Sequence, residues 1–443
     1  MTKYKPYSIY KPSGVEWLGE IPKHWQLRKL KFVAPPSTEK LAEKPSEKIY
    51  LGLENIESKT GRLILDSPIE VVDSIVTVFH AGDVLFGKLR PYLAKVVCAT
   101  FDGVCTSELL VLRPSNKLVD EKYLFYLLLS DGFINFIDSM TYGVKMPRAN
   151  PNQICNIVVS IPLLKEQKSI AHFLDREITR IDTLITKKRE MIDLLERKRA
   201  EIVTEAVTKG CDRNVSMKNS GISWIGEIPK HWLKIPIKYV CLSVRDGTHN
   251  PPAKVEGEYR LLSARNIQDG EFILRGDDRL MDADAFAELQ RSYTVCKGDV
   301  VVAVVGATTG KSAVVGDLEK ISVQRSIAIL KPNHSMINSN YLNFWISSPA
   351  LQHEIALTYS KYAAQGGIYL EDLANLTCVL PSLKEQTQIL SLLDKSFTPL
   401  LKAEQKLLEQ IDELQKYRQA LITAAVTGKI DVREEIKSDR GVA

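Results

Sequence analysis

The chain has 443 residues, of which 44% are apolar, and at roughly 100–200 residues per domain this predicts about two to four domains with cores of their own. A disordered chain is excluded. The 59 Lys and Arg residues nearly balance the 54 Asp and Glu residues, so the net charge of +5 excludes a bulk polycation. Any nucleic-acid binding must come from local patches.

The sequence has no feature of a membrane or exported protein. It has no run of about 18 apolar residues, and no apolar stretch follows the lysines of Met1–Pro6, as it would in a signal peptide. The cysteines form no C-x-x-C pair and have no His at ligand spacing, which predicts reduced thiols in the cytoplasm and no structural zinc. They are Cys98, Cys105, Cys155, Cys211, Cys241, Cys296 and Cys378.

The chain opens with a segment that it later repeats. Residues 13–25 read SGVEWLGEIPKHW and return at 220–232 as SGISWIGEIPKHW, an offset of 207. A second pair, IPLLKEQ at 161–167 and LPSLKEQ at 380–386, has an offset of 219, so the second copy is 12 residues longer between these landmarks. Such an internal duplication predicts two similar halves with divergent middles.

The first middle, residues 26–160, reads as a mixed domain with β-type runs followed by one amphipathic helix near 122–130. The runs are 83–86, 95–98 and 109–112. Between the first two runs, residues 88–95 (KLRPYLAK) carry three cations and an aromatic residue without an acid. Such a loop suits entry into a DNA groove, because Arg and Lys bind guanine edges or phosphates.

A long helical pattern follows, with apolar residues at spacings of 3 and 4 from Ile170 to Ala206, interrupted by Lys188 and Arg199. This spacing over about five heptads predicts coiled-coil packing. A helix over 163–209 would be about 70 Å long at 1.5 Å per residue. Gly210 lies where the helix should end.

The second middle, residues 233–379, repeats the order of strands and a helix. The apolar runs are 299–304, 312–315 and 327–330, and the helix is expected near 341–346. The loop counterpart, GATTGKS at 306–312, is polar and glycine-rich. Both middles are therefore expected to be α+β domains on one plan.

The second long helix is expected to start at Ser382-x-x-Glu385, a capping box, and to stop at Gly428. Pro399 predicts either a kink or a restart of the helix with Thr398 as its cap, because proline cannot donate a helical hydrogen bond. An antiparallel pair of such helices would hold the two divergent domains apart at its ends. Packing for stability alone is the alternative.

Two further motifs are incomplete. Residues 306–312 look like a phosphate loop, but G-x-x-x-x-G-K-[ST] needs Gly at position 305, which is Val305. Residues 250–253 (NPPA) lack the aromatic residue that stacks on a flipped base in amino-methyltransferases. His24 and His231 lie beside Trp25 and Trp232 in both copies, which predicts packing residues. The sequence offers no catalytic centre.

These motifs, in this order and twice, resemble the specificity subunit of bacterial type I restriction-modification systems over essentially the whole chain. Each half has Trp-x-Gly-x-Ile-Pro-x-x-Trp, a variable domain, Pro-x-Leu-Lys-Glu-Gln and a long helix. The resemblance also includes Gly82–Tyr92, Gly306–Lys311 and Ala424–Val432.

The resemblance implies an α+β fold of two similar mixed α/β target recognition domains, separated by two long antiparallel coiled-coil helices in a pseudo-two-fold duplication. Each domain would read half of a split, asymmetric DNA site. The bounds would be 1–162 for the first recognition domain, 163–210 for the central helix, 211–381 for the second domain, 382–430 for the distal helix and 431–443 for a tail.

The resemblance further implies double-stranded DNA, two methyltransferase subunits and restriction/translocase subunits as partners, with no membrane. S-adenosylmethionine, ATP and magnesium would belong to those partners, and this chain would bind no cofactor or metal of its own. The DNA-contact candidates, taken by position in the motifs, are Lys88, Arg90, Tyr92, Lys95, Lys145, Arg148, Thr248, His249, Asn250, Thr308, Thr309, Lys311 and Gln365.

Two other functions are open on the sequence alone. One is an enzyme acting by itself, as an NTPase at 306–312 or a methyltransferase at 250–253. The other is a coiled-coil scaffold that has no sequence-selective DNA binding.

Overall fold

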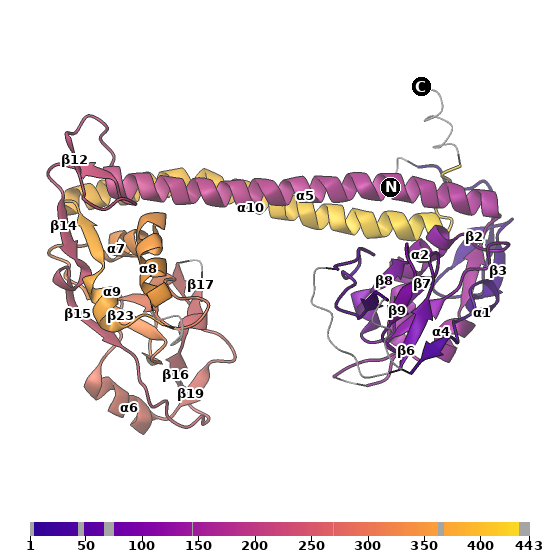
Figure 1. Ribbon diagram of the computed structural model, residues 1–443, viewed down its shortest axis with the longest axis horizontal. Helices are drawn as coiled ribbons and strands as arrows, with labels where there is room; N and C mark the ends of the chain where they lie inside the picture. Colours follow the sequence, from indigo (N-terminus) through magenta and orange to yellow (C-terminus); the bar gives the residue numbers. More distant parts are fainter. Residues whose placement is uncertain are drawn as a thin grey trace. The chain divides into compact units, whose positions relative to one another are not determined.

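The computed structural model describes residues 4–42, 48–65, 75–143, 145–268, 270–361 and 367–433. The chain divides into two compact units (Figure 1). The first unit comprises residues 1–188 and 408–443, and the second comprises residues 189–407. Each unit therefore holds one divergent middle and a part of each long helix.

The first unit builds its mixed α/β domain from short strands and helices. They are β1 (Tyr10–Pro12), β2 (Glu20–Pro22), β3 (Gln26–Lys29), α1 (Leu30–Val33), β4 (Lys40–Leu41), β5 (Tyr50–Leu51), β6 (Val76–Phe79), β7 (Val84–Gly87), η1 (Pro91–Leu93), β8 (Val96–Cys98), β9 (Gly103–Cys105), β10 (Leu109–Leu112), α2 (Glu121–Leu129), α3 (Asp131–Ser139), α4 (Pro151–Asn156) and β11 (Val158–Ile161).

The core of this domain lies on both faces of the three-stranded sheet β10-β7-β8. On one face, Leu85 of β7 and Val97 of β8 belong to the same apolar cluster as Phe79 of β6, a strand of the sheet β4-β6-β9-β5. Phe86 contacts Phe133 of α3 with ring centroids 6.0 Å apart. Successive side chains of a strand point to opposite faces, so a strand that is buried on both faces reads as a continuous apolar run.

The second unit has the same order of elements with additions. They are β12 (Met217–Asn219), β13 (Glu227–Pro229), β14 (Leu233–Pro236), η2 (Ile237–Tyr239), β15 (Cys241–Asp246), β16 (Tyr259–Leu262), η3 (Ala264–Asn266), β17 (Ile267–Gln268), β18 (Glu271–Phe272), β19 (Arg279–Met281), α6 (Ala283–Ser292), β20 (Val300–Ala303), β21 (Ser312–Val314), β22 (Ile321–Val323), β23 (Ile327–Pro332), α7 (Ser339–Ser347), α8 (Pro349–Lys361), α9 (Leu370–Asn375) and β24 (Thr377–Leu380).

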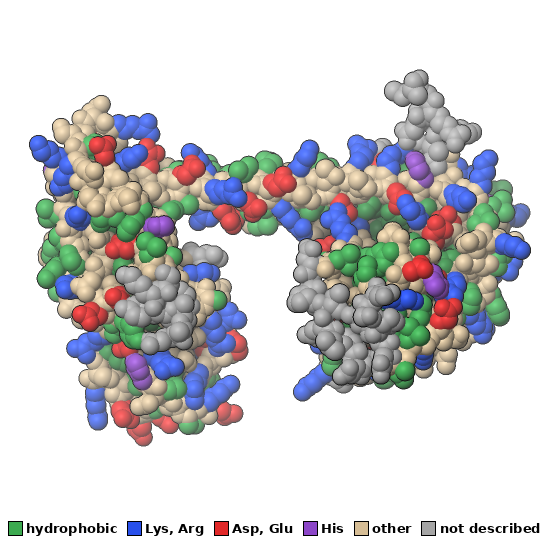
Figure 2. Space-filling model, in the orientation of Figure 1, with side chains coloured by type: hydrophobic (Ala, Val, Ile, Leu, Met, Phe, Trp, Pro, Cys, Tyr) green, Lys and Arg blue, Asp and Glu red, His purple; other side chains and the backbone are tan. Residues whose placement is uncertain are grey.

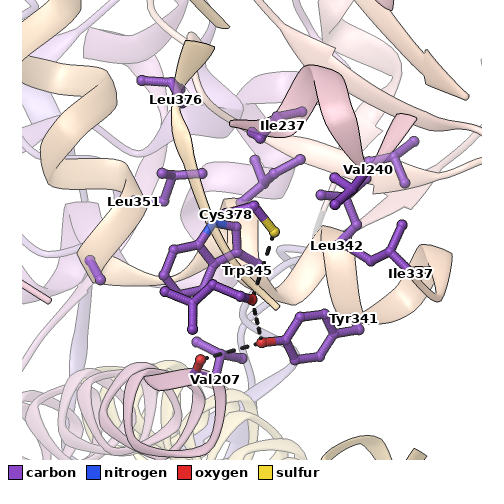
Figure 3. Packing of buried hydrophobic residues seen from close by; sticks show 14 of the residues in the cluster. Val207, Ile237, Val240, Ile337, Tyr341, Leu342, Trp345, Leu351, Leu376 and Cys378 are labelled. Carbon is purple, nitrogen blue, oxygen red and sulfur yellow. Dashed lines mark hydrogen bonds between the residues drawn. The ribbon is translucent and has the colours of Figure 1, made fainter. Parts of the chain in front are cut away.

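Strand β20 of the six-stranded sheet β15-β23-β20-β21-β18-β17 explains the valine run of this unit. Val300 and Val302 belong to the large cluster that contains the helix residues Tyr341 and Trp345. Val301 belongs to a separate cluster on the other side. Figure 3 shows the large cluster, where Tyr341 and Trp345 lie close to Cys378 and Val207.

The strands and helices that the sequence predicts are found in both units. Some elements whose apolar pattern is short or weak were not predicted. The expected helix near 122–130 is α2, and that near 341–346 is α7. Helix α6 was missed because its apolar stripe is short, with Phe286 and Leu289 only half-buried. The sheet β19-β16-β22 was also missed, since its strands are short and two of them, β16 and β19, are only partly buried.

The two long helices are α5 (Leu164–Lys209) and α10 (Leu383–Val426). Within each unit the local parts of α5 and α10 run antiparallel. Arg418 pairs with Asp182 at 3.0 Å in the first unit, and Arg199 pairs with Glu404 at 3.5 Å in the second. Lys188, the other cation in the apolar seam, donates to Gln410 at 2.6 Å. The charged residues that interrupt the apolar seam thus make polar contacts between the two helices.

Pro399 lies inside α10, which continues through it. The prediction of a restart with Thr398 as a cap is therefore wrong, since the Thr398 hydroxyl donates to the carbonyl of Asp394 at 3.0 Å within the helix. Pro399 removes one backbone donor, but it lies on an exposed face where water can serve the carbonyl left over. In the described part of the chain, no helix is long and apolar enough to span a membrane.

The helix ends agree with the predicted caps. Ser382 and Glu385 form the capping box, in which Ser382 N donates to the Glu385 carboxylate at 3.1 Å and Glu385 N donates to Ser382 Oγ at 3.4 Å. Gly210 and Gly428 have φ of +78° and +73°, the left-handed conformation that ends a helix.

A carboxylate joins each duplicated tryptophan segment to the start of a long helix, and it is buried in Glu166 and partly buried in Glu385. Trp25 Nε1 donates to Glu166 at 3.1 Å, and Trp232 Nε1 donates to Glu385 at 3.0 Å. Both tryptophans are almost fully buried. His24 and His231 also contact these carboxylates, at 2.8 and 2.7 Å, so they are carboxylate partners and not simply the packing residues that were predicted. We call this arrangement the carboxylate clamp.

A buried tyrosine joins each domain to the end of the other long helix. The Tyr123 hydroxyl lies 3.3 Å from the carbonyl of Val426 in α10, and that of Tyr341 lies 3.4 Å from the carbonyl of Val207 in α5. These carbonyls belong to the last turns, whose acceptors have no partner within the helix. The duplication is therefore visible in matched hydrogen bonds as well as in sequence.

The clamp predicts a pH-dependent stability. Burial alone would raise the pKa of Glu385, but hydrogen bonds from His231, Trp232 and Ser382 outweigh it and hold the pKa at about 2. Because this pKa is below the ordinary value of 4.5, the carboxylate contributes stability above that value, and the contribution is lost as the pH falls toward about 2. We expect Glu385→Gln to lower the free energy of unfolding by about 1–3 kcal/mol at neutral pH.

The measurement is urea denaturation followed by tryptophan fluorescence at several pH values. The difference between the variant and the wild type should shrink between about pH 5 and about pH 3. Glu227→Gln is the matched control, because this exposed carboxylate has no side-chain partner among the described residues. A difference that stays constant over this pH range would contradict the role of Glu385.

Candidate DNA interface

Two loops of the first unit lie side by side where β7 ends. Arg90 N donates to the carbonyl of Pro147 at 2.7 Å, and Ala149 N donates to the carbonyl of Lys88 at 2.9 Å. Leu89 and Arg148 form an isolated antiparallel bridge. The cationic loop 88–95 and the loop around 142–148, predicted separately, therefore form one surface. We call residues 88–95, 142, 143 and 145–148 the first rim.

The side chains of the first rim divide into exposed and engaged groups. Arg90, Tyr92 and Lys145 are exposed, and among the described residues no hydrogen bond or ion pair involves the side chain of Arg90 or Lys145. Arg148 Nη2 donates to Glu108 at 2.7 Å. Two lysines are partly buried, and burial lowers the pKa of Lys88 and of Lys95. Lys95 Nζ also donates to the carbonyl of Leu53 at 2.6 Å.

The backbone of the first rim is held in an uncommon conformation. Arg90 and Ala94 have φ of +51° and +47°, and they flank the single turn η1. Non-glycine residues with positive φ carry a conformational cost that the surrounding structure must offset, and they cluster at functional sites. Here the offset includes the hydrogen bond from Arg90 N to Pro147.

The second unit brings its candidate loops to one end of the six-stranded sheet. Asp246 at the end of β15 pairs with Ala328 near the start of β23, and Ile327 pairs with Ala303 at the end of β20. The segments that leave the sheet there are 247–250, 304–311 and the turn 324–326. We call these three segments the second rim.

The second-rim threonines are tied by short-range hydrogen bonds. Thr248 Oγ1 donates to the carbonyl of Asn250 at 3.1 Å, and Thr309 Oγ1 donates to the carbonyl of Gly306 at 2.6 Å. Thr308 is half-buried. These local bonds stiffen both loops.

The other second-rim candidates are exposed. His249 Nε2 lies 2.5 Å from the carboxylate of Asp246. Asn250 and Lys311 are exposed, and Lys311 has no side-chain partner in the part of the chain that the structure describes. Gln365 lies outside the described residues.

The two rims share a backbone framework and differ in side chains. Gly87 N donates to Lys95 O at 2.8 Å, and Ala303 N donates to Lys311 O at 2.8 Å, so Lys95 and Lys311 occupy equivalent positions. The bond from Lys88 N to Glu108 O has its counterpart in the bond from Val304 N to Ser326 O. Equivalent backbone positions therefore carry unlike residues in the two units.

Sequence reasoning missed Glu108 and Arg325, which lie in the turns before β10 and β23. Glu108 binds Arg148, and Arg325 is exposed next to Thr248, to whose carbonyl its backbone N–H donates at 3.0 Å. A polar residue just before an apolar run was the available signal. Such residues are too common in a sequence for this signal to identify Glu108 and Arg325 without knowledge of the strand pairing.

The surface charge is dispersed. Figure 2 shows Lys and Arg side chains scattered among Asp and Glu over both units on the face drawn, without one broad basic patch. Within the described ranges, no group of three or more His, Cys, Asp or Glu residues could hold a metal ion. The cations at the rims are thus the local feature that distinguishes these loops.

Comparison with known families identifies the chain. The model for the type I restriction modification DNA specificity domain matches residues 73–194 and 255–413, once in each half and over more than half of the chain. The chain belongs to this family. It is a type I restriction-modification specificity subunit with two target recognition domains.

Relatives with this description match much of the chain. The EcoBI specificity subunit of Escherichia coli is 24% identical over 79% of this chain and 74% of its own length. The putative MjaX specificity subunit of Methanocaldococcus jannaschii is 25% identical over 94% of this chain and 96% of its own.

A solved structure from work on complex assembly and conformational transition of the type I R-M system has the same fold. It covers 93% of this chain and 99% of its own, with a TM-score of 0.66 and 20% identity. The fold of two mixed α/β domains linked by two long helices is therefore confirmed.

Glu108 allows a direct test of the charge at the first rim. Removing its carboxylate by Glu108→Gln leaves the guanidinium of Arg148 without its anion, so we expect stronger binding of DNA at low salt. The slope of log K against log salt concentration should steepen by about one charge. The assay is a salt titration of DNA binding by the complex with the methyltransferase.

Glu319→Gln is the control, since this exposed carboxylate belongs to the second unit and has no side-chain partner among the described residues. An unchanged slope for Glu108→Gln would place Arg148 outside the DNA interface.

Proposed function

We propose that the two recognition domains each read one half of a split, asymmetric DNA site. The observation that carries this proposal is the pair of rims, which have equivalent backbone hydrogen bonds and unlike side chains. A protein with two unlike reading surfaces suits two unlike half-sites, as half-site spacing mirrors protein geometry in other DNA-binding proteins. The lengths of α5 and α10 would then set the gap between the half-sites.

The residues proposed to contact DNA are those of the two rims. In the first rim, Arg90, Tyr92 and Lys145 are best placed, because all three are exposed and the side chains of Arg90 and Lys145 have no hydrogen bond or ion pair among the described residues. Lys88, Lys95 and Arg148 would contribute only after their present contacts change. In the second rim, His249, Asn250 and Lys311 are exposed, whereas Thr248, Thr308 and Thr309 support the loops. Gln365 stays a proposal from sequence alone.

We propose that the chain has no catalytic centre, and that methylation and ATP-driven cleavage belong to partner subunits with S-adenosylmethionine, ATP and magnesium. In support, residues 306–312 connect β20 to β21, which pair antiparallel. A phosphate loop instead leads from a strand into the N-terminus of a helix. The NTPase alternative is disfavoured on this ground.

We further propose that α5 and α10 dock two methyltransferase subunits. Large apolar side chains are exposed along both helices, with Leu184 and Met191 seven residues apart on α5, and Leu401 and Leu408 seven residues apart on α10. A spacing of seven places such residues on one face of a helix. Exposed apolar faces of this kind mark interaction surfaces.

Exchange of the first recognition domain tests the reading of half-sites. Replacing residues 26–160 with the corresponding domain of another family member should change one half of the methylated motif and leave the other half intact. Base-resolution mapping of methylated DNA in cells with the methyltransferase partner gives the answer. A change in both halves would contradict two independent readers, and methylation unaffected by deleting the gene would favour the scaffold alternative.

Charge placed on the helix faces tests docking. Leu194 is 60% exposed and Leu408 is 48% exposed, so Leu194→Glu with Leu408→Glu should leave the fold intact while weakening assembly with the methyltransferase. The expected loss is about tenfold or more, because apolar contacts at an interface centre are worth over 1 kcal/mol each. Size-exclusion chromatography with light scattering measures assembly. Leu274→Glu, an exposed leucine outside the helices, is the control, and equal assembly of both variants would refute docking there.

A further inference from the structure

We propose that Arg325 reads a guanine in the half-site bound by the second recognition domain. This inference rests on the proposed function and names the base class for one side chain. Arg325 lies in the second rim, in the turn between β22 and β23. It has no counterpart among the contacts predicted from motifs.

The position of Arg325 is set by backbone contacts. Its N–H donates to Thr248 O at 3.0 Å, and Thr248 N donates to Val323 O at 2.9 Å, so the turn and the loop after β15 are tied together. Gly247 makes this approach possible, since a Cβ there would lie 2.2 Å from Val323 O. The backbone of Arg325 is thus held while its side chain extends outward.

The guanidinium is unengaged. Arg325 is exposed, and within the described ranges no carboxylate or carbonyl accepts a hydrogen bond from its side chain. Most other arginines of this unit are tied: Arg260 and Arg265 pair with Asp278, and Arg245 donates to the carbonyl of Ser292. An arginine left without partners on a stiff turn keeps all five donors for a ligand.

The two rims carry an arginine at different positions, Arg148 in the first and Arg325 in the second. In the first rim Arg148 bridges Leu89 and is neutralised by Glu108. In the second rim the equivalent bridge joins Val305 to Gly367, and Ser326 occupies the place of Glu108.

Gly367 leaves no room for a side chain, because a Cβ there would lie 2.8 Å from Val304 O. The second rim therefore lacks both the arginine and the acid of the first. Instead it carries Arg325, the residue that precedes Ser326. The equivalent residue of the first unit is Ser107, which precedes Glu108.

This difference points to base reading and not only to charge. Arginine binds O6 and N7 of guanine with two parallel hydrogen bonds in the major groove, a pattern that no other base presents. Thr248, His249 and Asn250 lie beside Arg325 and could contact neighbouring bases or phosphates. A phosphate contact is the competing role, and the experiment distinguishes the two.

The experiment uses the full chain in complex with its methyltransferase, a library of DNA sites and base-resolution mapping of methylation. Arg325→Ala should make one G·C position of one half-site degenerate and reduce modification of the original site by roughly 5- to 150-fold. The other half-site should be unchanged. Arg325→Lys, which keeps the charge but not the paired donors, should also relax that position.

Lys297→Ala is the matched control. Lys297 is an exposed cation just before β20, at the opposite end of the same sheet, and it pairs with Asp317. It should leave the motif and the modification rate unaltered. Melting temperatures of all variants check the fold, which should persist because Arg325 is exposed and no hydrogen bond or ion pair involves its side chain in the described part of the chain.

Several results would overturn the proposal. A motif that keeps every position while binding weakens equally on all sequences would make Arg325 a phosphate contact. Unchanged binding and motif would remove Arg325 from the interface, and so would a wild-type half-site without a G·C pair. Two other results would contradict the proposed function itself: a wild-type complex that yields no split motif, or a domain exchange that changes neither half-site.

Discussion

The hydrogen-bonded carboxylate at the start of each long helix, buried in Glu166 and partly buried in Glu385, is the interaction on which both recognition domains depend. Glu166 and Glu385 accept hydrogen bonds from the indole of a buried tryptophan in the same unit. A buried carboxylate left without donors would be costly, so the duplicated Trp segment and the helix start must come together. At the other side of each domain, the hydroxyl of Tyr123 or Tyr341 donates to a strand carbonyl at 2.9 Å and lies within 3.4 Å of a carbonyl in the last turn of the opposite helix. Each domain is thereby held by the beginning of one helix and the end of the other.

The contacts that attach each domain to the long helices recur in both units, whereas the side chains of the two rims differ. The clamp, the tyrosine contact and the glutamine that follows each clamp glutamate recur in both units: Gln167 accepts from Asp120 N at 2.8 Å, and Gln386 accepts from Asn338 N at 2.8 Å. The rims, by contrast, are connected through main-chain hydrogen bonds that place few demands on side chains. Exposed rim side chains can therefore change with little effect on folding, because surface substitutions away from such networks have small energetic effects.

The charges of the rims show why a nearly neutral protein can address DNA. Cations that are paired or partly buried, such as Arg148 and Lys95, are held by their neighbours. Among the described residues no hydrogen bond or ion pair involves the side chains of Arg90, Lys145, Lys311 and Arg325, and these residues lie in loops that are held by main-chain hydrogen bonds. A few unpaired cations on stiff loops favour selective contacts over general attraction, since the non-specific part of DNA affinity grows with the number of phosphates neutralised.

The sequence by itself determined the duplication, the two long helices with their caps, and the apolar strands. Each of these leaves a periodic or repeated signal that does not depend on partners distant in the chain. Only the tertiary structure decided which loops share a rim, that Lys95 and Arg148 are engaged, and that Arg325 has no side-chain partner among the described residues, because strand pairing brings together residues far apart in sequence. The same holds for His24 and His231: their carboxylate partners lie about 150 residues away, where local pattern carries no information.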